Sequence, residues 1–221
     1  MDQKKFNFIK EKYGLLASWA VWAEAGDKAK SNMGDLSVFD DPDVIDSLNE
    51  NIIFVALNGS REGIKIPLAN FHDPNPRAQD FKTRYALQNT PYWGGYMTDI
   101  IKNYSEVDSS KIPSYLKDNP KVELDNIKVF EEELTDLEVQ DPLIIAFGDV
   151  TYKILKRNFD SKYKVIKIFH YAHQISKEDY RKHVKKVLDK FSYPQKNYDE
   201  NWEKFNEKST THLLHTWKNS L

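Results

Sequence analysis

Four short apolar segments recur along the chain and predict the strands of a sheet. The run at 52–57 is rich in β-branched side chains and lacks the alternation of a half-exposed strand. This pattern is typical of a strand that is buried on both faces. Further strands are predicted at 96–101, which follows two glycines, and at 143–147 and 165–169.

Helical patterns lie between these strands. Asp41 followed by Pro42 predicts a helix start, because the acid can cap the first turn and proline suits the first helical position. Charged or amphipathic segments predict helices at 123–138, 150–159 and 199–217.

Three other segments complete the pattern. Ser176 is expected to cap a helix, and the segment 13–25 is apolar and aromatic, which predicts a buried arm or a short helix. The segment 59–78 is a long loop, and a loop of this length inside a compact domain is usually functional. The helix after Ser176 should bury one apolar face: Tyr180, Val184, Val187, Leu188 and Phe191.

Strands that alternate with helices predict an α/β fold, a three-layer αβα sandwich with a central four-stranded parallel sheet. We expect one domain over 1–221, with an aromatic N-terminal arm (1–50) and a helical C-terminal extension (about 195–221). In such sheets ligands bind outside the carboxyl ends of the strands. Asn58, Asp99 and His170 lie at or near three of these ends.

Composition narrows the class of protein. The 221 residues are 40% apolar and 30% charged, and no apolar run approaches the roughly 20 residues of a membrane span. The first residues lead into no secretion signal. Cysteine is absent, which excludes disulfides, thiolate nucleophiles, cysteine-ligated zinc and iron–sulfur clusters. We therefore expect a cytoplasmic protein that has no contact with a membrane.

Charge is divided unevenly along the chain. Residues 1–150 carry 16 Lys and Arg against 26 Asp and Glu, whereas residues 151–221 carry 16 against 8. Such a division can mark a face for an anionic partner, or it can reflect solvated helix faces only. Charge alone favours the solvated faces.

Common catalytic motifs are missing from the sequence. It has no G-x-S-x-G elbow, no phosphate-binding P-loop and no G-x-G-x-x-G fingerprint. His170 and His173, and likewise His212 and His215, are three residues apart, but neither pair has a nearby carboxylate to complete a metal site. We expect neither a metal ion nor a cofactor.

Each polar strand end has a structural interpretation when it is taken alone. Asn58 precedes Gly59, and Asn-Gly is a common turn pair. Asp99 could cap a strand end, and His170 could be a satisfied core histidine. These interpretations weaken when the three residues are considered together, because one fold uses all three positions.

Taken together, these segments resemble the uracil-DNA glycosylase superfamily, especially its mismatch-specific and single-strand-selective branches. The segment 54–60 is similar to the strand and first catalytic motif, and 165–176 is similar to the later strand that ends in histidine. The segments 144–155 and 95–102 resemble the strand-Gly-helix segment and the base-reading strand. The resemblance covers roughly residues 50–190 in the correct order and implies four parallel strands between helices.

Four positions depart from the family pattern. Gly59 replaces a proline, and Tyr171 and Ala172 replace a Pro-Ser pair. Asp99 stands where many uracil enzymes have asparagine. An ionised carboxylate only accepts hydrogen bonds, so Asp99 favours donor-rich edges such as those of guanine, hypoxanthine, xanthine or the cytosine amine.

The resemblance implies a base-excision DNA-repair enzyme, a DNA N-glycosylase. In that role Asn58 would hold the hydrolytic water, His170 would stabilise the departing base, Phe71 would stack on the base, and Asp99 would read its edge. The pocket would also include Gly59, Ser60, Tyr171 and His173, and DNA phosphates would contact Lys177, Arg181, Lys182, Lys185 and Lys186.

A non-catalytic protein that binds a nucleotide or modified base is the alternative. The acidic first part of the chain and the altered motifs favour it, while the intact Asn58 and His170 favour the enzyme. In both cases we expect a monomer whose partner is DNA or a nucleotide.

Overall fold

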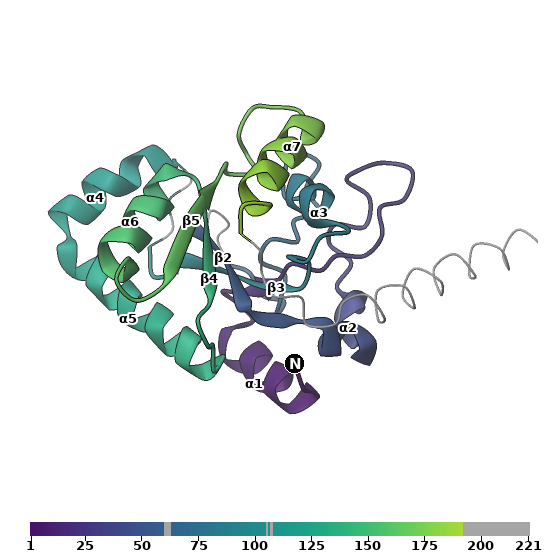
Figure 1. The fold of residues 1–221 in the computed structure, drawn as a ribbon, viewed down its shortest axis with the longest axis horizontal. Helices are drawn as coiled ribbons and strands as arrows, with labels where there is room; N and C mark the ends of the chain where they lie inside the picture. The colour runs from purple at the N-terminus through teal and green to yellow at the C-terminus, as the bar shows by residue number, and fades with distance from the viewer. Residues whose placement is uncertain (60–62, 105, 107, 192–221) are drawn as a thin grey trace, which may run out of the picture. The chain divides into compact units, whose positions relative to one another are not determined.

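The computed structural model describes residues 1–191 apart from 60–62, 105 and 107. Residues Met1–Lys190 form one compact unit, built on a five-stranded sheet in the order β1-β3-β2-β4-β5 (Figure 1). The strands are β1 (Ser18–Trp19), β2 (Asn49–Asn58), β3 (Gly95–Ile101), β4 (Leu143–Phe147) and β5 (Lys164–Ile168). The predicted C-terminal extension and the pair His212 and His215 lie outside the described residues.

The prediction of an α/β fold is confirmed, but the prediction of a purely four-stranded parallel sheet is wrong. Strands β2, β3, β4 and β5 are parallel, whereas β1 adds a fifth strand antiparallel to β3. Strand β1 arises from the segment that was expected to be an arm or a short helix. Its two residues show no periodicity, and Trp19 is fully buried with its ring 5.0 Å from that of Tyr96. The strand conformation of β1 therefore depends on its packing against β3.

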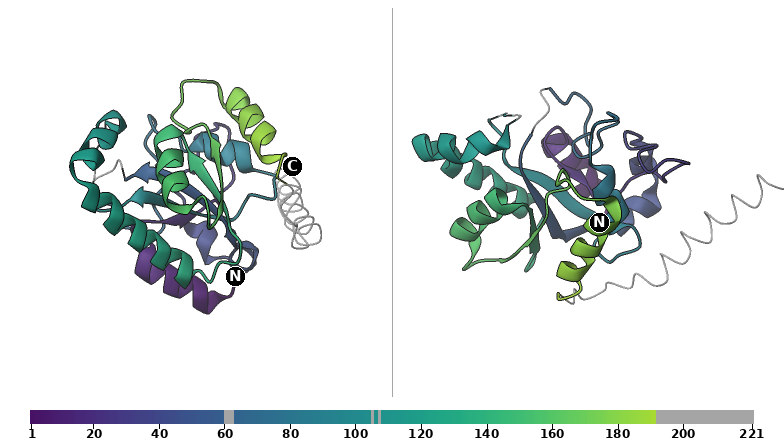
Figure 2. Two further views of the ribbon diagram at one scale, coloured as in Figure 1. Left: turned by 60° about the vertical axis from the view of Figure 1, so that its left-hand side comes forward. Right: turned by 90° about the horizontal axis from the view of Figure 1, so that it is seen from above.

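Helices cover both faces of the sheet. The helices α5 and α6 lie on one side and α3 and α7 on the other (Figure 1; Figure 2). The helices are α1 (Gln3–Tyr13), α2 (Pro42–Ser47), α3 (Phe81–Leu87), α4 (Ile112–Asp118), α5 (Pro120–Asp136), α6 (Asp149–Phe159) and α7 (Lys177–Leu188), with 3-10 turns η1 (Ser37–Asp40) and η2 (Ser109–Lys111). Among the described residues, no helix combines the length and apolar character that crossing a membrane requires.

Local capping explains where several helices begin. The side chain of Asp41 accepts from the Asp43 N–H at 2.9 Å, and that of Ser176 accepts from the Asp179 N–H at 3.0 Å, as predicted. On α7, Tyr180, Val184 and Leu188 are buried, as predicted. Val187 is half-buried, and Phe191 lies beyond the end of the helix. Helices α1, α3 and α4 were not predicted.

Alternation along β2 separates its side chains between the two faces. Ile53, Val55 and Leu57 belong to the core that includes α5 and α6, so Phe54 and Asn58 face the opposite side with α3 and α7. The Phe54 ring stacks on that of Phe147 in β4 at 5.8 Å. This second face also carries Asp99, which pairs in register with Ala56 of β2.

The strand order creates a switch point at the centre of the sheet. From β2 the chain continues to β3 on one side, and from β3 it crosses to β4 on the other side of β2. Ligands of open α/β sheets bind at such a reversal, outside the carboxyl ends of the strands. Here Asn58 ends β2, and Gly148 follows β4 with φ +83°.

Candidate functional site

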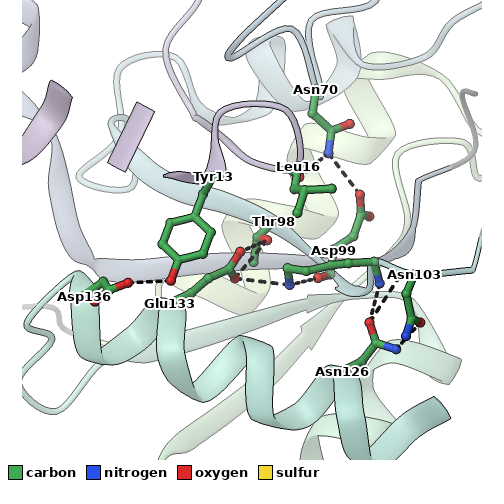
Figure 3. A network of polar contacts seen from close by, with 10 residues as sticks. Tyr13, Leu16, Asn70, Thr98, Asp99, Asn103, Asn126, Glu133 and Asp136 are labelled. Atoms are coloured by element: carbon green, nitrogen blue, oxygen red, sulfur yellow. Dashed lines mark hydrogen bonds and ion pairs between the residues drawn. The ribbon is translucent and has the colours of Figure 1, made fainter. Parts of the chain in front are cut away.

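Asp99 lies on the second face of β3 and is 5% exposed. It pairs in register with Ala56 of β2. Its Oδ2 accepts a hydrogen bond from Asn70 Nδ2 at 3.0 Å. Figure 3 shows the two side chains pointing toward one another, with Asn70 contributed by the long loop that precedes α3. The predicted base-reading residue is thus held by a partner far away in the sequence.

Phe71 follows directly and is 3% exposed. Its backbone N–H donates to Asn70 Oδ1 at 3.2 Å, and its carbonyl accepts from Trp22 Nε1 at 3.1 Å. Its φ is +65°, a conformation that is rare for a bulky side chain and that surrounding contacts must maintain. The predicted stacking aromatic is therefore buried in a strained backbone, next in sequence to the residue that bonds Asp99.

Asn58 is half-buried at the end of β2, where it pairs with Ile101. Its Nδ2 donates to the Glu106 carbonyl at 2.9 Å, which gives the carboxamide a defined orientation. Neither Asn58 nor Gly59 has a positive φ. The pair therefore does not form the left-handed turn for which Asn-Gly is typical.

Gly59 connects this strand end to Asp99. A Cβ at Gly59 would lie 3.9 Å from Asp99 Oδ2, which is ordinary van der Waals contact, so Gly59 lies beside the carboxylate. Ser60, which was predicted to line the same pocket, lies outside the described residues.

His170 is half-buried two residues beyond β5. Its Nδ1 accepts from the Ala172 N–H at 3.1 Å, which leaves Nε2 as the protonated nitrogen of the neutral ring. Burial lowers the pKa of His170 to about 4. At neutral pH the side chain is therefore an uncharged donor through Nε2.

His170 belongs to the same face as Asn58 and Asp99. The Phe147 ring meets the His170 ring edge-on at 6.2 Å. A Cβ at Gly148 would lie 3.6 Å from the Cβ of His170. Because only β4 separates β2 from β5, these two strands lie roughly 10 Å apart. That separation is within the length of a nucleoside.

The other predicted pocket residues differ in their surroundings. The Tyr171 ring lies 4.2 Å from that of His170, so it borders the same strand end. His173 is exposed and contacts the Phe169 ring at 4.8 Å. Its carbonyl accepts from Nζ of the buried Lys82 on α3 at 2.9 Å, which ties the turn after β5 to that helix.

The basic residues of α7 lie on its surface, among acidic residues. Lys182 pairs with Asp179 at 3.6 Å, and Lys185 pairs with Asp189 at 2.8 Å. Lys177 and Arg181 lie over the Tyr85 ring of α3 at 4.3 and 5.2 Å, and Lys186 is exposed.

A buried ion pair lies behind Asp99 on the other face of β3. Lys102 Nζ is 3.2 Å from an oxygen of Glu133 on α5, and both side chains are almost fully buried. The Thr98 hydroxyl donates to Glu133 at 3.1 Å, and Lys102 also donates to the Asp99 carbonyl (Figure 3). Burial raises the pKa of Glu133 in spite of Lys102.

Sequence reasoning missed two parts of this arrangement. Glu133 stands among the apolar positions of α5, next to Leu134 and one turn from Phe130, and an acid on an apolar face was the available signal. Asn70 had no such signal, because asparagine is ordinary in a loop.

Comparisons with known proteins found no match: no family model, no curated protein and no solved structure matches this chain. Among the described residues, no group of three or more His, Asp or Glu side chains could hold a metal ion.

Proposed function

We propose that this protein is a DNA N-glycosylase similar to the uracil-DNA glycosylase superfamily, which binds an extruded nucleobase and hydrolyses its N-glycosidic bond. The observation that carries the proposal is the common face of Asn58, Asp99 and His170 at the carboxyl edge of the sheet. This edge includes the switch point, where α/β proteins bind their ligands.

Recognition of the base would precede the chemistry. Extruding a nucleotide from a stack costs a few kcal/mol, which contacts with the base have to offset. Asp99 would accept hydrogen bonds from the edge of the base, beside Gly59. The stacking role that the resemblance implies for Phe71 is not part of the proposal, because its side chain is 3% exposed.

Asn58 would orient the attacking water. Its Nδ2 is engaged by the Glu106 carbonyl, so it would accept a hydrogen bond from water through Oδ1. A carboxamide is not basic enough to deprotonate water. The bond from C1′ to the base nitrogen would therefore break first, with its electron pair leaving on the base. The water oxygen then bonds to C1′, and its proton balances the charge on the base.

His170 would stabilise the departing base. Its neutral ring can direct the Nε2 proton at the negative charge that develops on the base. A donor aimed at developing charge supplies about 3 kcal/mol, roughly a hundredfold in rate.

The alternative is a non-catalytic protein that binds a nucleotide or a modified base at the same edge. The observation that favours it is the pairing of basic residues on α7 with acids of the same region, which reduces the net positive charge available to DNA. Such a protein would bind a free nucleotide without cleaving any oligonucleotide.

Substitution of Asn58 tests the enzyme directly. Oligonucleotides that carry uracil, hypoxanthine, xanthine or common mispairs would be incubated with the wild-type protein and with Asn58→Ala. We expect cleavage of at least one substrate by the wild type and a loss of about a hundredfold or more in the variant, because the water is no longer oriented.

Asn119→Ala is the matched control, because Asn119 also donates to a backbone carbonyl at 2.9 Å but lies between α4 and α5. Full activity in Asn58→Ala would contradict the assignment of Asn58. Nucleotide binding without any cleavage by the wild type would favour the alternative.

A further inference from the structure

Both polar atoms of the Asn70 side chain are hydrogen-bonded. Nδ2 donates to the Leu16 carbonyl at 2.7 Å and to Asp99 Oδ2 at 3.0 Å, while Oδ1 accepts the Phe71 N–H at 3.2 Å. The side chain belongs to a residue that is 8% exposed. Rotating the amide by 180° would set Oδ1 against two acceptors, so only one orientation satisfies all three contacts.

The orientation of the Asn70 amide determines the hydrogen-bonding role of the Asp99 carboxylate toward a ligand. The carboxylate already accepts a hydrogen bond from an amide that cannot act as an acceptor in return. Asp99 is therefore held as an acceptor.

The same amide also holds Phe71. Its Oδ1 retains the backbone N–H of a residue whose φ is +65°, and Trp22 fixes the carbonyl on the other side. Asn70 thus joins Phe71 to the residue that would read the edge of the base.

We propose that Asn70 is a positioning residue that makes Asp99 an obligate acceptor, so that the site selects bases with two adjacent N–H donors, as on the edge of a 2-amino-6-oxopurine. This proposal rests on the proposed function, because it assumes that Asp99 faces a base. A carboxylate can accept from the N1–H and the 2-amino group together. Uracil and xanthine instead flank a single N–H with two carbonyls, which would face the carboxylate oxygens and repel them. The proposal therefore excludes xanthine, which was expected from the sequence to suit Asp99.

Exchange of the two side chains tests the proposal. Binding would be measured by fluorescence titration with single-stranded oligonucleotides that differ only in one guanine, hypoxanthine, xanthine or uracil. All proteins would also carry Asn58→Ala, which separates binding from cleavage. The compared variants are Asp99→Asn, Asn70→Ala, and the double exchange Asn70→Asp with Asp99→Asn.

We expect the parent protein to bind the guanine oligonucleotide roughly tenfold or more tightly than the uracil one. Asp99→Asn should reduce or reverse this ratio, because an amide can donate to a carbonyl. The double exchange restores an amide-to-carboxylate hydrogen bond between positions 70 and 99 but places the amide on strand β3. It should therefore favour uracil as Asp99→Asn does.

Asn70→Ala separates positioning from simple support of the fold. If Asn70 positions Asp99, its loss should lower the guanine-to-uracil ratio while thermal denaturation remains cooperative. If the ratio stays at the parent value in Asp99→Asn and Asn70→Ala, the proposal is wrong. Should Asn70→Ala fail to fold, Asp99→Asn and the double exchange decide the question alone.

The outcomes also separate this proposal from the proposed function. Cleavage by the wild type with an unchanged base ratio in Asp99→Asn would overturn the role of Asn70 and leave the glycosylase in place. Base discrimination that is lost in both Asp99→Asn and Asn70→Ala, without cleavage by the wild type, would support the role of Asn70 and remove the glycosylase. Binding of none of the four oligonucleotides by the folded protein would overturn both.

Discussion

His170 illustrates how environment gives an ordinary side chain a specific chemical state. The Ala172 N–H determines which ring nitrogen carries the proton, and burial lowers the pKa of His170 from 6.5 to about 4. The sequence placed His170 at a strand end but contained nothing about either effect. Both depend on atoms that the turn after β5 brings around the ring.

This lowered pKa predicts a loss of stability in acid. The unfolded chain binds a proton at His170 below about pH 6.5, whereas the folded protein resists it down to about pH 4. Protonation therefore stabilises the unfolded state relative to the folded state as the pH falls through this window, by about 1–3 kcal/mol. Urea denaturation at pH 7 and at pH 4.5 should show a smaller loss in His170→Gln than in the wild type.

His173→Gln is the control for this measurement, because His173 is a nearby histidine that is exposed rather than buried. It should lose as much stability as the wild type on acidification. An equal loss in His170→Gln and the wild type would show that the buried ring does not contribute to the acid sensitivity.

At the scale of elements, the predicted strands and the cap of α7 were correct because they depend on local patterns. The helix that was predicted over 123–138 is α5, and Ser176 caps α7 as expected. Strand β1 and helices α1, α3 and α4 were missed. Strand β1 is only two residues long. Helices α3 and α4 have seven residues each, which is too short for a clear periodicity.

Helix α7 carries a prediction about nucleic acid. If its exposed face contacts phosphates, Lys182→Gln with Lys186→Gln should reduce the slope of log affinity against log salt by roughly one to two units. The pairing of Lys182 with Asp179 does not prevent this, because exposed ion pairs contribute little. Oligonucleotide binding would be measured over a range of salt concentrations.

A double change elsewhere serves as the reference. Lys117 and Lys121 are exposed, on α4 and at the start of α5, and Lys117→Gln with Lys121→Gln alters the net charge equally. This variant should retain the wild-type slope. Equal slopes in both double variants and the wild type would exclude α7 from the binding surface.

At the scale of the whole chain, the positive charge is concentrated in one described segment. Residues 151–190 contain 12 Lys and Arg against 4 Asp and Glu, whereas residues 191–221 contain 4 of each. The excess of positive charge in residues 151–221 therefore lies entirely within 151–190. These residues belong to the compact unit Met1–Lys190, which contains α6, β5 and α7.

A chain that ends at Lys190 should retain both the fold and the binding surface. The unit contains its own buried core, from Phe6 to Leu188. We expect thermal denaturation to stay cooperative, with a midpoint within about 5 °C of the full chain, and the salt slope to be unchanged. Loss of cooperativity would show that residues 191–221 are needed for folding.

The sequence by itself determined the α/β class, the four parallel strands and the polar residues at their ends, because these depend on short-range periodicity and residue type. Only the tertiary structure decided the fifth strand, the neutral form of His170 and the contact of Asn70 with Asp99, 29 residues away. The tertiary structure also decided the ion pair between Lys102, which follows β3, and Glu133 of α5. Such contacts depend on how distant segments pack. Local propensity carries no information about which side chains come together when these segments pack, or about which of them become buried.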